Sequence, residues 1–104
     1  MRRIIRRYLV HDSTGEAASP GYGGYGAFEL LVPPRTIVIS AVGECGCLYV
    51  YAEICPGSAE ITEDRQTQMV YVVGVNQPVE VPYDARLLGA VKIGLYVFHV
   101  YAQA

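Results

Sequence analysis

Apolar residues recur along this chain either at every second position or in short continuous runs bounded by Gly, Pro, Asp or Asn. A repeat of two is typical of half-buried β-strands, and the β-branched and aromatic residues that fill the runs favour pleated sheets. The pattern predicts seven strands, at Ile4–Val10, Ala27–Val32, Thr36–Gly43, Cys47–Ile54, Met69–Val75, Arg86–Ile93 and Leu95–Tyr101. Short strands with frequent turn signals indicate an all-β domain, either a compact β-sandwich or a small barrel.

The same alternation assigns side chains to the two faces of a strand. In the predicted strand Cys47–Ile54, one face carries Leu48, Val50, Ala52 and Ile54, and the other carries Tyr49, Tyr51 and Glu53. In Thr36–Gly43, we expect Ile37, Ile39 and Ala41 to share one face.

The predicted strands Met69–Val75 and Leu95–Tyr101 are apolar on both faces. Such strands are central and covered on both sides, or they lie at a subunit interface. A chain of 104 residues has little material to cover a second face. Its charged content of 17% is also below the typical value of about 25%. We therefore expect a homo-oligomer.

Length and composition set further bounds. One domain, 1–104, is large enough to fold without covalent staples, and an odd number of cysteines argues against a disulfide framework. The first residues lack the apolar core of a secretion signal, and no apolar run approaches the ~20 residues that span a membrane. We expect a soluble protein with no membrane partner. The net charge of −2 neither predicts nor excludes nucleic acid.

The segment 11–26 is rich in glycine and tyrosine and is predicted to be a long loop. Its residues Tyr22 and Tyr25 lie among Gly21, Gly23, Gly24 and Gly26. Two aromatic rings on such a backbone would stack on a base or anchor in a partner's groove. The alternative is that both tyrosines pack down on the sheet.

Arg2, Arg3, Arg6 and Arg7 form the only dense cluster of charge in the sequence. Guanidinium groups on both faces of a strand could bind phosphate through paired hydrogen bonds. The favoured interpretation is different: charged side chains on an edge strand discourage unwanted strand pairing.

Cysteine and histidine give no predicted catalytic or metal centre. Cys45, Cys47 and Cys55 lack the spacing and the fourth ligand of a structural zinc site, so we expect three small buried hydrophobes. His99 is expected to make a buried hydrogen bond in its strand, and His11 to be the more accessible histidine. We expect no enzyme activity and no cofactor.

Short motifs along the chain resemble a family of small domains of unknown function found mostly in bacteriophages and prophages. The matching pieces are Arg7-Tyr8, Val32-Pro33, Leu48–Ala52, Gly74–Val79, Gly89–Val91 and Val97–Tyr101. Where the family has a Gly-Thr-Gly-His-Pro turn, this chain has Gln77 in place of histidine and Asn76 in place of the second glycine. We still expect a turn at this segment, because Asn76 tolerates a positive φ. The resemblance implies a shared β-fold and a phage origin, and hence the host cell cytoplasm.

Together these features predict a non-catalytic phage accessory protein that acts by binding. The expected role is to inhibit a host defence system, by occupying a host protein or by sequestering a small nucleotide signal. Its expected contact residues are Tyr22, Tyr25, Arg3, Arg6, Arg7, Asn76, Gln77 and His99. The alternative is a structural virion component, such as a capsid-decorating β-domain.

Overall fold

The computed structural model describes residues 2–11, 25–57 and 65–103, and these residues form strands and turns without a helix. The strands are β1 (Ile4–His11), β2 (Gly26–Val32), β3 (Ile37–Glu44), β4 (Cys47–Ile54), β5 (Gln66–Gly74), β6 (Arg86–Ile93) and β7 (Tyr96–Ala102). Each predicted strand is present, and the bounds of β4 and β6 are those that the sequence predicted. The all-β prediction is confirmed.

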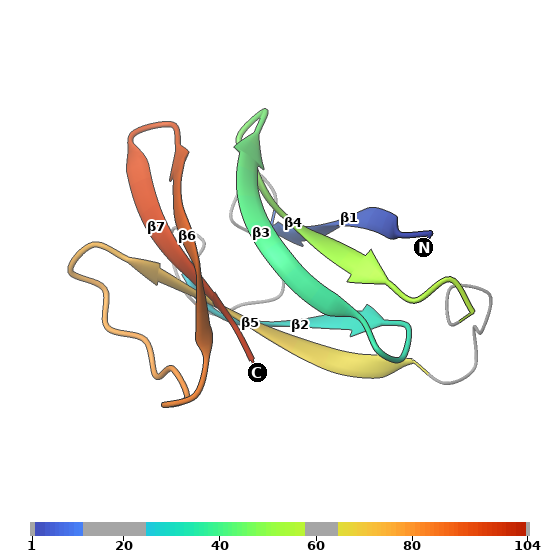
Figure 1. The fold of residues 1–104 in the computed structure, drawn as a ribbon. Helices are drawn as coiled ribbons and strands as arrows, with labels where there is room; N and C mark the ends of the chain where they lie inside the picture. The colour runs from blue at the N-terminus through green and yellow to red at the C-terminus, as the bar shows by residue number, and fades with distance from the viewer. Residues whose placement is uncertain (1, 12–24, 58–64, 104) are drawn as a thin grey trace.

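The strands form two antiparallel sheets, one ordered β1-β4-β3 and the other β2-β5-β7-β6. Figure 1 shows them as two separate layers that are not closed into a barrel, so the sandwich is the correct one of the two predicted architectures. The two predicted strands that are apolar on both faces, β5 and β7, are the central strands of the four-stranded sheet.

Two tight hairpins build much of this arrangement. Cys45 and Gly46 join β3 to β4 with φ values of 52° and 77°, as a type I′ turn requires. Gly94 and Leu95 join β6 to β7, and only Gly94 has a positive φ, at 60°, which fits a type II′ turn. Both turn types match the twist of the strands that they join.

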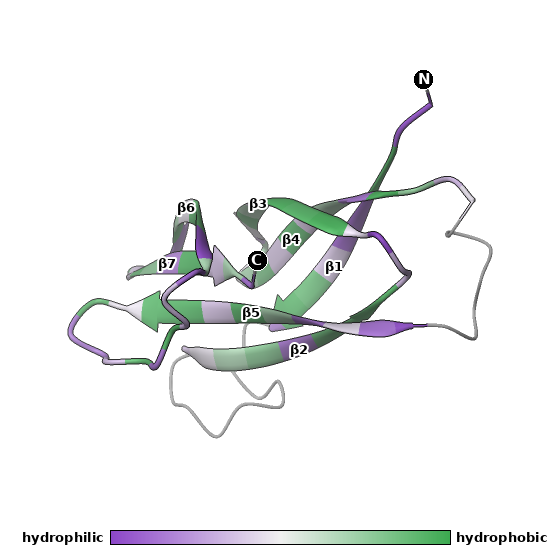
Figure 2. Cartoon of the chain, turned by 60° about the horizontal axis from the view of Figure 1, so that its bottom comes forward, coloured by the Kyte–Doolittle hydropathy of each residue, from purple (hydrophilic) through white to green (hydrophobic). Residues whose placement is uncertain are grey.

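The core lies between the sheets and follows the predicted alternation. Leu48, Val50 and Ala52 on β4 are fully buried, whereas Tyr49 and Tyr51 point outward. Phe28 on β2 and Phe98 on β7 are the aromatic members of the buried cluster. Figure 2 shows apolar and polar residues alternating along the ribbons of both sheets. Each buried Leu, Val or Phe contributes roughly 1.5–3 kcal/mol relative to exposure.

Two β-bulges shift side chains from one face to the other. In β3 the register slips between Val38 and Ser40, so Ile37 and Ile39 are exposed while Ala41 packs against the core. The expectation that Ile37, Ile39 and Ala41 share a face is therefore wrong, because a bulge inserts an extra residue into the alternation.

In β1 the register slips between Leu9 and His11, and both Val10 and His11 are buried. Two successive residues face inward here because the bulge interrupts the alternation.

The two sheets meet where β3 lies against β6. A Cβ atom on Gly43 would come within 2.9 Å of the Lys92 carbonyl oxygen, so only glycine fits there without a shift of the backbone. Farther along the same seam, the Arg86 guanidinium donates a hydrogen bond to the Val38 carbonyl oxygen. These contacts fix one side of the sandwich.

Candidate functional site

A tight turn follows β5 at one end of the sandwich. The Gln77 amide donates a hydrogen bond to the Gly74 carbonyl oxygen at 3.1 Å, and Asn76, the third turn residue, has a φ of 60°. A positive φ at that position is the mark of a type II turn and is tolerated by Asn. The expected turn role of Asn76 is confirmed. The turn also brings the Gln77 side chain back toward Gly74 and Phe98.

A pocket of about 440 Å³ opens beside this turn, and we call it the ring pocket. It is lined by Tyr25, Gly74, Val75, Gln77, Leu95, Tyr96, Val97 and Phe98. These residues come from the position just before β2, the end of β5 and the turn after it, the β6–β7 turn and the start of β7. Segments far apart in the sequence therefore converge on one opening.

The ring pocket has a rigid floor and an exposed rim. Phe98 is only 4% exposed, and its ring lies 6.0 Å from that of His11 in an edge-on arrangement. His11 also contacts Phe28, with ring centroids 5.7 Å apart. At the rim, Tyr96 is 66% exposed and its ring centroid lies 6.3 Å from that of Phe98. Buried rings hold the floor in place while Tyr96 remains available to a ligand.

The described lining of the ring pocket carries no ionisable acid, imidazole or thiol. Its polar groups are the Gln77 carboxamide, the tyrosine hydroxyls and the backbone. Such a lining suits a flat, uncharged ring that stacks on aromatic faces and forms one or two hydrogen bonds.

Of the predicted contact residues, Tyr25 and Gln77 line the ring pocket and Asn76 shapes its turn. Tyr22 lies outside the described residues. Arg6 and Arg7 lie on β1 of the other sheet, and Arg3 directly precedes that strand. His99 lies on the outer face of β7. The predicted set is therefore divided among separate surfaces.

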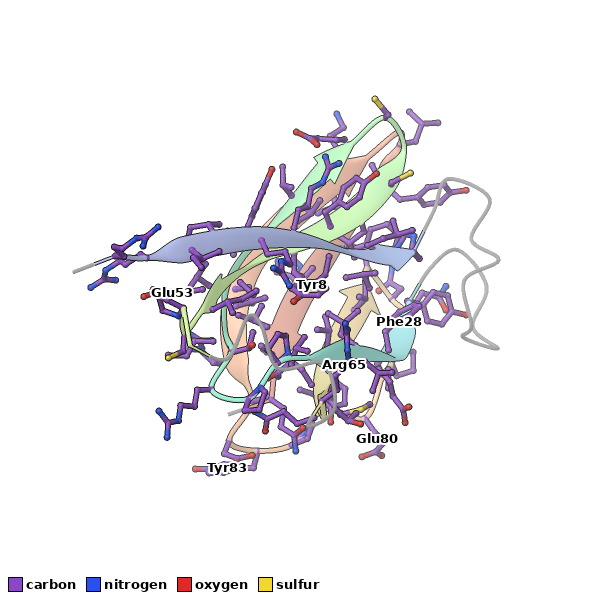
Figure 3. All side chains as sticks on the ribbon, turned by 90° about the vertical axis from the view of Figure 1, so that its right-hand side faces the viewer. Tyr8, Phe28, Glu53, Arg65, Glu80 and Tyr83 are labelled. Atoms are coloured by element: carbon purple, nitrogen blue, oxygen red, sulfur yellow. The ribbon has the colours of Figure 1, made fainter. Side chains whose placement is uncertain are left out.

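Two of the three predicted arginines, Arg3 and Arg7, are paired with acids. Arg3 forms an ion pair with Glu53 at 3.2 Å, near the start of β1 where Figure 3 labels Glu53. Arg7 forms one with Glu44 at 2.8 Å. β1 is an edge strand, and Arg6 sits at a core-facing register position opposite Ala52 while remaining exposed. This arrangement fits edge protection better than a phosphate site.

The two histidines have exchanged the places expected for them. His99 is exposed, so the expected buried hydrogen bond is wrong. His11, expected to be accessible, is 3% exposed. The bulge in β1 turns His11 inward, whereas His99 pairs with Val73 on the outward-facing side of the four-stranded sheet.

The cysteines also differ from expectation. Cys45 is exposed and both Cys47 and Cys55 are half-buried, so none is a fully buried hydrophobe. Cys45 occupies the β3–β4 turn, which puts it at the surface. Partial desolvation, and after it the nearby Cys47 thiol, raise the pKa of Tyr49, whose ring lies 4.2 Å from the Arg7 guanidinium carbon. The described residues contain no cluster of three metal-ligating side chains.

Sequence reasoning missed Leu95, Tyr96 and Phe98 as pocket residues. The available signal was Gly94-Leu95 between two apolar runs, which is a hairpin signature that exposes the residues beside it. What the sequence could not show is that this hairpin turn lies beside the turn after β5.

Comparison with known proteins identifies no relative: no family model, no curated protein and no solved structure matches this chain. The phage family resemblance thus stays a prediction. Among residues 2–11, 25–57 and 65–103, there is no helix long and apolar enough to cross a membrane.

Proposed function

We propose that this chain is a non-catalytic binding protein whose ring pocket takes a nucleobase. The observation that carries the proposal is the convergence of Tyr25, Tyr96 and Phe98 with the Gln77 carboxamide around about 440 Å³. A base offers a flat face for the rings and an edge that pairs with a carboxamide. Phosphate groups would extend outward, because the described lining offers them no cation.

The biological role that we propose is to sequester a nucleotide signal of a host defence system. It rests on the phage setting implied by the sequence motifs and on a pocket suited to binding. No catalytic constellation needs to be invoked, since holding a signal molecule away from its receptor is sufficient.

Calorimetric titration with adenosine, guanosine, cytidine and uridine tests the proposal at the molecular level. We expect at least one nucleoside to bind, whereas ribose, which lacks a base, does not. Tyr96→Ala should weaken binding by about 5- to 150-fold, since one base–aromatic stack is worth roughly 1–3 kcal/mol.

The matched control is Tyr83→Ala. Tyr83 is fully exposed, lies outside the ring pocket and projects from the lower edge of the molecule in Figure 3. It should leave nucleoside affinity unchanged. If no nucleoside binds at millimolar concentration, or if both variants lose affinity equally, the proposed function is wrong.

A second candidate function, a structural virion component, is favoured by another surface. On the outer face of the three-stranded sheet, Ile5, Leu9 and Ile37 are each at least half exposed beside Tyr49 and Tyr51. Exposed apolar groups of this kind mark contact surfaces between proteins. Mass spectrometry of purified phage particles tests it: a stoichiometric amount supports the virion role, and absence from particles excludes it.

A further inference from the structure

A second cleft, of about 450 Å³, lies at the opposite end of β5 from the ring pocket. It opens where β3, β5 and β6 begin and β7 ends, and its polar lining is Arg35, Thr36, Gln66, Gln68, Arg86 and Gln103. We call it the arginine cleft. Its described lining contains two arginines and no acidic residue, in contrast to Arg3 and Arg7, which are each paired with a glutamate.

Arg86 is held in place by the fold. Its guanidinium donates a hydrogen bond across the seam between the sheets to the Val38 carbonyl oxygen, beside the bulge in β3. A guanidinium has five N–H donors, so most of those on Arg86 remain available after this contact. Arg86 makes no ion pair with the described residues.

Arg35 is placed at a backbone position that is costly for a side chain. It follows Pro34 in the β2–β3 connection and has a φ of 63°, in the left-handed region where glycine is unstrained. Arg35 makes no hydrogen bond or ion pair with any described residue. Arg35 is the third residue of the turn that contains Pro34, a position that requires a positive φ and is usually taken by Gly or Asn, so the turn explains the φ value but not the choice of arginine.

The remaining polar groups are engaged with the backbone. The Gln68 carboxamide donates to the carbonyl oxygens of Met69 and Gln103, at 3.1 and 3.2 Å. The Pro33 carbonyl oxygen accepts from the Thr36 hydroxyl at 2.6 Å and from the Gln66 carboxamide at 3.5 Å. These bonds fix the walls of the cleft, and they leave the two guanidinium groups as the donors that an incoming ligand would meet.

We propose that the arginine cleft binds a phosphate group, either inorganic phosphate or the phosphate of a monoester. Each guanidinium group can donate a pair of hydrogen bonds, and one carboxylate has only two oxygens to accept them. A phosphate group presents three or four oxygens, so it matches two guanidinium groups better than a carboxylate does. A bound dianion would also offset the repulsion between the two arginines. This site is separate from the ring pocket: along β5, Gln68 is its residue nearest to Gly74 of the ring pocket. That stretch of strand spans about 20 Å, which one mononucleotide does not bridge.

The test is a titration of the full chain with inorganic phosphate at low ionic strength, followed by NMR of the arginine side chains. We expect saturable shifts at Arg35 and Arg86. Arg35→Gln should weaken phosphate binding at least tenfold. Its matched control, Lys92→Gln, removes the same charge from the outer face near the other end of β6 and should change affinity less than twofold.

Arg35→Gly separates a binding role from a structural one. Because glycine relieves the positive φ, this variant should unfold at a temperature no lower than that of the original chain, yet lose phosphate binding as Arg35→Gln does. A parallel titration with phenyl phosphate distinguishes a monoester from free phosphate by which binds more tightly.

Three outcomes would overturn the proposal. They are the absence of saturable phosphate binding, equal losses in Arg35→Gln and Lys92→Gln, and acetate binding as tightly as phosphate. Nucleosides carry no phosphate and inorganic phosphate carries no base, so failure at this cleft and failure at the ring pocket are measured independently.

Discussion

At the Gly74 end of β5 the sandwich presents aromatic rings and a carboxamide, whereas at the Gln66 end it presents two guanidinium groups. The ring pocket is built on a buried floor, since Phe98 belongs to the core cluster. The arginine cleft is built on hydrogen bonds to backbone carbonyl oxygens, with its arginines exposed. The same four-stranded sheet therefore supports an apolar site at one end through side-chain packing and a polar site at the other end through hydrogen bonds to the backbone.

Removing the floor of the ring pocket should have the largest effect. Phe98→Ala deletes a buried ring that contacts His11 and Tyr96, and we expect it to lower the free energy of unfolding by about 3–5 kcal/mol. Urea denaturation measures this loss. If stability fell by less than about 1 kcal/mol, packing would not distinguish the ring pocket from the arginine cleft.

A smaller loss is expected at the arginine cleft. Arg86→Gln removes the donor to the Val38 carbonyl oxygen, and Val38 is almost fully buried. An unsatisfied buried acceptor costs about 1–3 kcal/mol, again measured by urea denaturation. Lys92→Gln serves as the control, because Lys92 is exposed and should leave stability unchanged. If Arg86→Gln and Lys92→Gln changed the free energy of unfolding equally, the structural role assigned to Arg86 would be wrong.

The smallest effect is expected outside both sites. His99→Ala changes an exposed side chain on the outer face and should alter the free energy of unfolding by less than about 0.5 kcal/mol. His11→Ala, beneath the ring pocket, should cost about 2 kcal/mol or more, since it removes a buried ring. Thermal unfolding of the two variants side by side checks the ranking, and a reversed order would contradict the assigned burial.

Local pattern was sufficient to predict the strands but not how they pair. β4 alternates as the sequence predicts because no bulge interrupts it. In β1 and β3 a single inserted residue reverses the face of those that follow, and the sequence carries no separate signal for it. For this reason the inward positions of His11 and Ala41 were not predicted.

The candidate sites show the same limit. Asn76 was predictable as a turn residue because its tolerance of positive φ is a property of one side chain. The arginine cleft was not predictable, because Arg35 and Arg86 come to line one cleft only through the docking of β3 on β6. Pro34-Arg35 between two strand patterns signals a turn, but nothing local signals a cationic site.

The hydrogen bond from Arg86 to Val38 has a kinetic consequence, because it joins residues 48 positions apart in the chain. The β3–β4 and β6–β7 hairpins are local structures, and each can form early in folding. The seam between them requires closure of a long loop, which is slow and entropically costly. Phosphate would bind only after the hairpins have docked. It would therefore stabilise the whole domain by mass action, and amide exchange should slow in both hairpins together.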